Sequence, residues 1–133
     1  MLGEPIGEIK GKISYQKVLD VEGPKMETTV SAGGYFKGIE ITAALTYVAS
    51  PSSEGVLHGV GKGVMHTADG EIVTYMGQGI GKFDSSGLLN WRGALFFKTN
   101  SQAKLQFLNN MVGVFEAHID SQGNFTEKTW EWK

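Results

Sequence analysis

Residues 55–83, GVLHGVGKGVMHTADGEIVTYMGQGIGKF, contain two glycine-rich apolar runs on either side of the dipeptide Asp69-Gly70. An Asp-Gly pair between alternating apolar runs is a strong hairpin signal, because a type I′ turn needs positive φ at both central residues. The sequence therefore predicts a long β-hairpin. Its register stays open between a two-residue turn and a three-residue bulged turn, which pair the two arms differently.

Glycine occupies every second position on both arms of this hairpin. The glycines are Gly59, Gly61 and Gly63 on the first arm and Gly77, Gly79 and Gly81 on the second. Because side chains alternate between the two faces of a strand, each arm has one face almost without side chains. Such a face suits a sharply bent sheet, or the close approach of a backbone, a bulky side chain or a ligand. In one register the glycines face side chains across the hairpin, and in the other glycine meets glycine.

The rest of the chain repeats the pattern of short strands and turns. Apolar and polar residues alternate with period two in residues 6–19, 25–32, 35–49, 88–99 and 111–120, and a last strand follows residue 124. Gly33-Gly34 is interpreted as one of the reversals, and residues 101–110 as one short helix capped by Ser101. About eight antiparallel strands in a mostly meander order predict an all-β barrel, with a β-sandwich as the alternative.

Length and composition narrow the class of protein. The 133 residues fit one domain, residues 1–133. The net charge is -2 and the basic residues are scattered, which disfavours nucleic acid as a partner. No apolar run approaches the roughly 20 residues that span a bilayer, and no signal peptide is recognisable, so we expect a cytoplasmic protein without a membrane span. The chain has no cysteine, which excludes disulfides and a thiol nucleophile.

The sequence predicts neither a metal site nor a cofactor. His58 and His66 would lie on one arm of the hairpin, roughly 26 Å apart at about 3.3 Å per residue, which is too far to share a metal ion. The GxGxG runs lead into β-turns, whereas phosphate-binding glycine loops lead into the N-terminus of a helix.

Three residues are candidates for catalysis. Glu116 and His118 share one face of a strand, about 7 Å apart, and form a general acid–base pair if that face lines a cavity. On a solvated face they are ordinary surface residues. Arg92 lies among apolar neighbours and needs an anionic partner, for which Glu116 and Glu71 are available. The alternative for Arg92 is an anchor for a ligand carboxylate.

The candidates for ligand binding are mostly aromatic. They are Trp91, Arg92, Phe97, Asn109 and Phe115. The competing interpretation places the aromatic residues in the core and gives Asn109 the task of ending the helical turn.

The order of segments after the hairpin resembles a known superfamily. The Asp84–Gly87 turn, WRGALFFKT at residues 91–99 and LQFLNNMVGVFEAHIDSQGN at residues 105–124 are similar in pattern to allene-oxide-cyclase-like and dirigent-like β-barrels, including uncharacterised bacterial relatives. The resemblance covers roughly residues 55–133. It implies an eight-stranded barrel with an apolar cavity, often oligomeric, in families that cyclise or couple reactive lipid or phenolic intermediates.

These observations favour a barrel that binds a small apolar or amphipathic molecule, since such pockets are largely apolar with a few polar groups. One alternative is a cyclase or isomerase that holds a lipid-like or phenolic intermediate and uses Glu116, His118 and Arg92. Another is a structural module that forms homo-oligomers.

Overall fold

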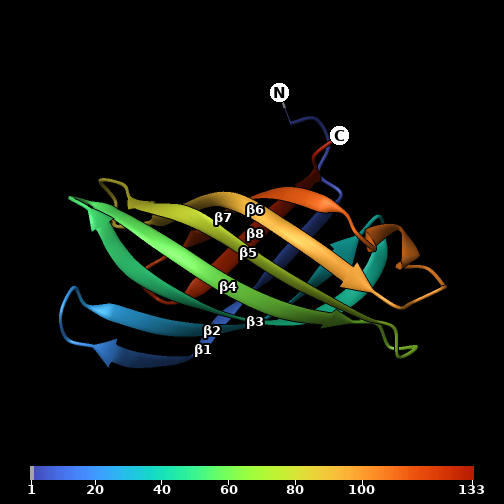
Figure 1. Ribbon diagram of the computed structural model, residues 1–133, viewed down its shortest axis with the longest axis horizontal. Coiled ribbons are helices and arrows are strands. Elements are labelled where there is room, and N and C mark those ends of the chain that lie inside the picture. The colour runs from blue at the N-terminus through green and yellow to red at the C-terminus, as the bar shows by residue number, and fades with distance from the viewer. Residues whose placement is uncertain (1) are drawn as a thin grey trace.

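The computed structural model describes residues 2–133 and forms a closed barrel of eight antiparallel strands (Figure 1). The strands are β1 (Gly7–Asp20), β2 (Lys25–Phe36), β3 (Ile39–Ser53), β4 (Val56–His66), β5 (Ile72–Phe83), β6 (Leu89–Thr99), β7 (Val112–Ile119) and β8 (Asn124–Glu131). Each strand pairs with the next in the chain, and β8 pairs with β1 to close the barrel. The predicted meander barrel is confirmed, and the alternative β-sandwich is not what forms.

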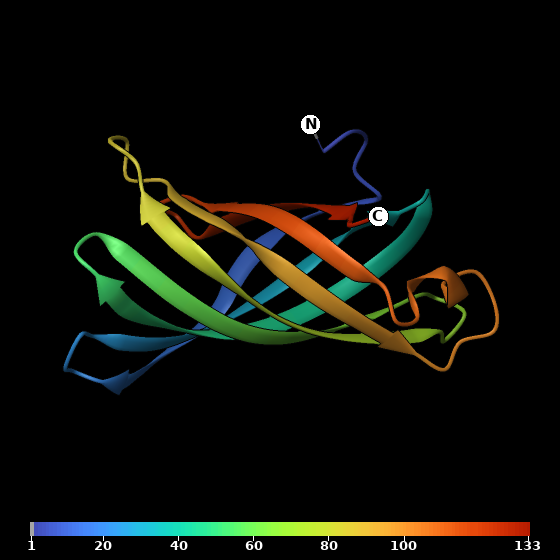
Figure 2. The same cartoon turned by 45° about the horizontal axis from the view of Figure 1, so that its top comes forward.

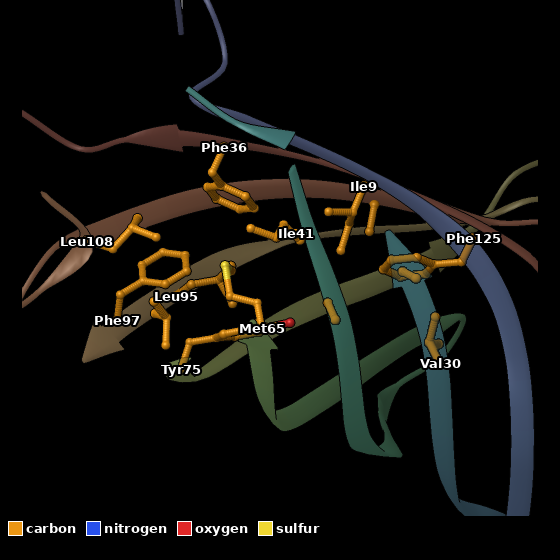
Figure 3. Packing of buried hydrophobic residues seen from close by; sticks show 14 of the residues in the cluster. Ile9, Val30, Phe36, Ile41, Met65, Tyr75, Leu95, Phe97, Leu108 and Phe125 are labelled. Atoms are coloured by element: carbon orange, nitrogen blue, oxygen red, sulfur yellow. The ribbon is translucent and has the colours of Figure 1, made fainter. Parts of the chain in front are cut away.

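Buried and exposed residues alternate along the strands, and the buried ones form the core inside the barrel. On β6, for example, Trp91, Leu95 and Phe97 are buried while Arg92 and Phe96 are exposed. Figure 3 shows buried side chains from different strands meeting inside the wall, and the rings of Phe36 and Phe97 lie edge to face with centroids 6.1 Å apart. Closure of the sheet gives these residues a common interior.

The connection after β6 forms one end of the barrel, as Figure 2 shows. Of the helix predicted over residues 101–110, only a 3-10 turn exists, η1 (Gln106–Leu108). Ser101 does not cap this turn, which begins only after Leu105. Its hydroxyl group accepts a hydrogen bond from the N–H of Ala103 at 3.2 Å and donates one to Glu71 Oε1 at 2.6 Å. The backbone N–H of Leu105 donates to the same carboxylate at 2.8 Å. Leu105 and Leu108 are fully buried, so apolar packing holds the loop together with these hydrogen bonds.

The central hairpin adopts the bulged register. The N–H of Thr67 donates to the carbonyl oxygen of Glu71 at 3.1 Å, and the N–H of Gly70 donates to that of Thr67 at 3.0 Å. Of the three loop residues 68–70, only Gly70 has positive φ, so the type I′ turn that the Asp-Gly pair predicts does not form. In this register Gly59 pairs with Gly79, and Gly61 pairs with Gly77. Glycine therefore meets glycine across the hairpin.

The reversal predicted at Gly33-Gly34 is wrong. Both glycines lie inside β2, and the chain turns at Lys37 and Gly38, which have φ of 47° and 78°. Gly34 is needed for another reason, since a Cβ there would lie 2.8 Å from Cα of Ile9 on β1. Gly34 thus allows β1 and β2 to approach closely, whereas Gly33 has no such contact.

Candidate functional site

Aromatic rings from neighbouring strands cover the glycine faces of β4 and β5. A Cβ on Gly59 would lie 2.8 Å from the ring of Trp91, and one on Gly81 would lie 2.9 Å from the same ring. The ring of Tyr75 covers Gly63 in the same way. Trp91 also meets Tyr47 of β3, with ring centroids 5.4 Å apart. Most of the space that the glycines leave is thus filled by side chains of the protein itself.

A cavity of about 60 Å³ remains beside these rings. Its apolar lining comes from Leu45, Leu95, Phe115, Ala117 and Phe125, together with Gly59, Gly61, Gly77 and Gly79. Lys62 and Gln78, which are exposed on the outer face, border it as well. The cavity therefore extends to the glycine-rich part of the wall formed by β4 and β5.

One acidic side chain, Glu127 on β8, contributes to this lining. It points inward between Ile9 of β1 and Ala117 of β7, and only 8% of it is exposed. Desolvation raises the pKa of the Glu127 carboxyl to about 8, with no cation or hydrogen-bond donor among the described residues to oppose it. At neutral pH this carboxyl group is therefore mainly protonated and can donate a hydrogen bond.

Three more polar groups reach the same cavity. The hydroxyl group of Tyr75 and Nε1 of Trp91 are buried and have no hydrogen-bond partner within residues 2–133. Burial, followed by the negative charge of Glu127, raises the pKa of Tyr75, so its phenol stays neutral. Burial also raises the pKa of Tyr47, an effect that Thr28 and Trp91 partly offset.

The strand register explains why Glu127 and Trp91 face one space. Glu127 pairs with Ala117, and Ala117 pairs with Trp91, so the three residues form one row across β8, β7 and β6. Neighbouring strands lie about 4.8 Å apart, which separates the two outer backbones by roughly 10 Å. The methyl group of Ala117 fills little of that gap, and the cavity lies above it.

The structure places the three catalytic candidates on the outer face of the barrel. Arg92 and Glu116 are cross-strand neighbours, with Nε and Oε2 3.9 Å apart, and their side chains are 81% and 36% exposed. The ion pair is thus exposed and not buried as the apolar neighbours suggested. His118 Nδ1 makes a short hydrogen bond with Asn90 Oδ1 at 2.5 Å, also on the outer face. None of the three lines the cavity.

Of the five candidates for ligand binding, two line the cavity and three do not. Trp91 and Phe115 line the cavity. Phe97 packs into the core against Tyr75, with ring centroids 5.5 Å apart. Asn109 Oδ1 accepts a hydrogen bond from the N–H of Thr99 at 3.1 Å, which fixes the end of the loop after β6. Arg92 lies outside.

Sequence reasoning missed Glu127 and Tyr75. The signal for Glu127 is its position in FTEKTWEWK, two residues after Phe125 and two before Thr129, all of which are buried. An acidic residue in phase with buried neighbours on a strand points into the core. The signal for Tyr75 is its place on the inner face of β5, two residues before Gly77.

Residues 2–133 contain no group of three or more His, Cys, Asp or Glu side chains that could hold a metal ion. Over the same residues, no helix has the length and apolar character needed to cross a membrane.

Solved structures share this fold at low sequence identity. A protein of unknown function from Clostridium acetobutylicum is 14% identical with a TM-score of 0.80, covering 98% of both chains. A conserved protein of unknown function from Rhodopseudomonas palustris is 13% identical with a TM-score of 0.78, covering 96% of this chain and 95% of the other. A β-barrel-like protein from Acinetobacter baumannii is 15% identical with a TM-score of 0.75, covering 98% and 94%.

No family model matches the chain, and no curated protein matches it. At these identities the three structures establish a common fold and nothing about a ligand or a reaction. The chain is a closed eight-stranded antiparallel β-barrel that shares its architecture with bacterial proteins of unknown function.

Proposed function

We propose that this protein binds a small apolar or amphipathic molecule inside the barrel. The observation that carries the proposal is the Glu127 carboxyl group, which borders a largely apolar cavity without a hydrogen-bond partner among the described residues. Leaving a buried polar group unpaired costs about 1–3 kcal/mol. A ligand that hydrogen-bonds to Glu127 recovers part of that free energy and buries its own apolar part against Leu95 and Phe115.

The cavity volume sets the size of the ligand. A single water molecule needs roughly 10–15 Å³ when volume is measured this way, whereas pockets for drug-sized ligands span about 300–1,000 Å³. The 60 Å³ found here accommodate a molecule of a few non-hydrogen atoms. A larger ligand requires the ring of Trp91 to move off Gly59.

Xenon tests whether the cavity is accessible at all, because it binds to apolar cavities without needing a hydrogen bond. We expect pressurised xenon to shift the backbone amide resonances of Gly77, Gly79 and Ala117 saturably in NMR spectra. Ala117→Leu should abolish these shifts by filling the cavity. Ala44→Leu, on the exposed outer face of β3, is the matched control and should leave them unchanged.

Two results would contradict the proposal. One is the absence of saturable shifts at the glycines that line the cavity. The other is equal xenon binding by the wild-type protein and Ala117→Leu, since the cavity would then not be the binding site.

The resemblance to allene-oxide-cyclase-like barrels stays a prediction, and so does a cyclase or isomerase activity. Arg92, Glu116 and His118 lie on the outer face, so they do not reach a molecule in the cavity. Our proposal therefore assigns them no part in binding.

Self-association is a second candidate function, favoured by a groove on the outer face of β2–β6. Met76, Val60 and Phe96 in this groove are 66%, 53% and 52% exposed. Glu27 and Lys62 border the same groove with opposite charges. In a two-fold symmetric dimer the same patch meets itself, so Lys62 can pair with the glutamate of a second copy.

Light scattering coupled to size-exclusion chromatography tests self-association. We expect a dimer that Met76→Lys converts to a monomer, while Ile72→Lys leaves it intact. Ile72 is a matched control because it is 57% exposed on the same strand but lies outside the groove. A wild-type monomer at about 100 µM would exclude this function, because interfaces of about 1,600 Å² bind with micromolar or tighter affinity.

A further inference from the structure

The polar groups around the cavity share one property: each can donate a hydrogen bond. Nε1 of Trp91 is a donor only, and the neutral hydroxyl group of Tyr75 donates readily. Both are buried without a partner within residues 2–133. A protonated Glu127 carboxyl adds an O–H donor.

The residues around Glu127 provide no strong acceptor or fixed opposite charge. Ile9 and Ala117 flank it on β1 and β7 and are apolar. The titratable groups that share its cavity are the phenols of Tyr47 and Tyr75 and the ammonium group of Lys62. Lys62 is exposed on the outer face, where its charge stays hydrated.

We propose, resting on the function proposed above, that the occupant is an uncharged molecule with one accepting oxygen, such as a small ketone, aldehyde or ester. Its oxygen accepts a hydrogen bond from the protonated Glu127 carboxyl, with Tyr75 and Trp91 as further donors. Its hydrocarbon part lies against Leu95 and Phe115.

Charged ligands fit this arrangement less well. An ammonium ligand would need an ionised Glu127, and bringing both charges out of water costs more than a neutral hydrogen bond. A carboxylate ligand would bring its own charge into an apolar space in which Tyr75 and Trp91 offer only neutral donors.

Probes of nearly equal size separate these classes. We expect 2-butanone to bind more tightly than isobutane, sec-butylamine or butyrate, as measured by NMR titration at pH 6.5. The infrared carbonyl band of bound 2-butanone should lie at lower frequency than in hexane, because a donated hydrogen bond weakens the C=O bond. Ala117→Leu should abolish binding of every probe.

Variants of Glu127 test the role of its O–H group. Glu127→Leu should weaken 2-butanone binding roughly tenfold, which is the effect of losing one hydrogen bond, and leave xenon binding unchanged. Glu127→Gln keeps a donor and should retain the ketone. In the wild-type protein ketone affinity should fall as the pH rises above 8, where the carboxyl group loses its proton, and Glu127→Gln should remove that dependence.

The outcomes distinguish this inference from the proposed function. If xenon binds but 2-butanone shows no advantage over isobutane, the cavity is a binding site and the inference is wrong. Preference for sec-butylamine that Glu127→Gln abolishes would show that Glu127 acts as an anion, which also overturns the inference. If neither xenon nor any four-carbon probe binds, the proposed function itself fails.

Discussion

The ring of Trp91 lies directly over Gly59, two strands away across the barrel wall, and two of its ring atoms come within 2.8 Å of where a Cβ on that glycine would be. The same ring covers Gly81 on the intervening strand. A single indole thus packs against two glycine positions, which explains why the central hairpin has side chains missing from one face.

Gly59→Ala should therefore destabilise the fold. Its methyl group has to displace a ring that is 95% buried, and overpacking of this kind costs about 1–3 kcal/mol. Gly33→Ala is the matched control, because Gly33 lies on a strand, has no positive φ, and has its nearest atom 3.5 Å from the added Cβ. Urea unfolding followed by Trp fluorescence measures both variants. Equal midpoints for the two alanines would contradict the packing of Trp91 on Gly59.

The pH dependence of stability should report the environment of Glu127. Its pKa is raised to about 8 when folded, from an ordinary value of 4.5, so below pH 4.5 the group is protonated in both states. As the pH rises from 4.5 to 8 the unfolded chain releases the proton first, and stability falls. The loss is on the order of a few kcal/mol, since each pKa unit corresponds to about 1.4 kcal/mol.

Glu127→Gln removes this titration and should flatten the decline in stability between pH 4.5 and 8. Thermal unfolding across this range measures the effect, and we expect the variant to be the more stable protein at pH 8.5. Thr129→Val, buried two residues along the same strand, is the control and should keep the wild-type slope. An unchanged slope in Glu127→Gln would mean that the carboxyl group is hydrated in the folded state.

The loop after β6 should depend on Glu71. Its carboxylate accepts hydrogen bonds from Ser101 Oγ and the N–H of Leu105, and these hydrogen bonds lower its pKa. Glu71→Leu removes the acceptor of both hydrogen bonds, so we expect faster amide hydrogen exchange in residues 101–111 with little change in β1 and β2. Glu40→Leu, an exposed acid on β3 that is outside this network, should leave exchange in the loop unchanged. Protection that is equal in Glu71→Leu and the wild-type protein would assign the order of the loop to Leu105 and Leu108 alone.

The sequence predicts the strands well because alternation and turn residues are local signals. The barrel follows from their number and order, since eight meander strands remove their exposed edges by closing. Gly33-Gly34 shows where local reasoning fails. Gly34 serves the approach of β1 to β2, which depends on how the sheet coils and not on the neighbouring sequence.

The site is less predictable than the fold for a related reason. Glu116 and His118 attract attention as a titratable pair, but only the closed barrel decides that their face is outside. From the sequence alone, Glu127 is one of several charged residues near the C-terminus. The buried residues Phe125 and Thr129, two positions to either side, show that it lies on the inner face of β8. Residue spacing shows which side chains of a strand share a face. Which of the two faces lies inside the barrel is decided only when all the strands are considered together.

Three hairpins of the barrel have the same bulged turn. Substitutions of Gly87 can test whether this turn requires a glycine. In each hairpin, the glycine that ends the loop, at position 70, 87 or 123, has positive φ and donates its N–H to the carbonyl oxygen three residues before it. Gly87 has a φ of +87° and no atom within 4 Å of an added Cβ, so any cost of Gly87→Ala comes from backbone strain alone.

We expect Gly87→Ala to lower the free energy of unfolding by about 1–2 kcal/mol, since a side chain disfavours this conformation. Gly87→Asn should recover part of the loss, because asparagine tolerates the left-handed region better than alanine. At Gly33 the φ is not positive and an added Cβ makes only an ordinary contact at 3.5 Å, so Gly33→Ala separates strain from the general effect of adding a methyl group to a glycine. Chemical unfolding of the three variants measures the difference. If Gly87→Asn is no more stable than Gly87→Ala, a factor other than φ limits the turn at this position.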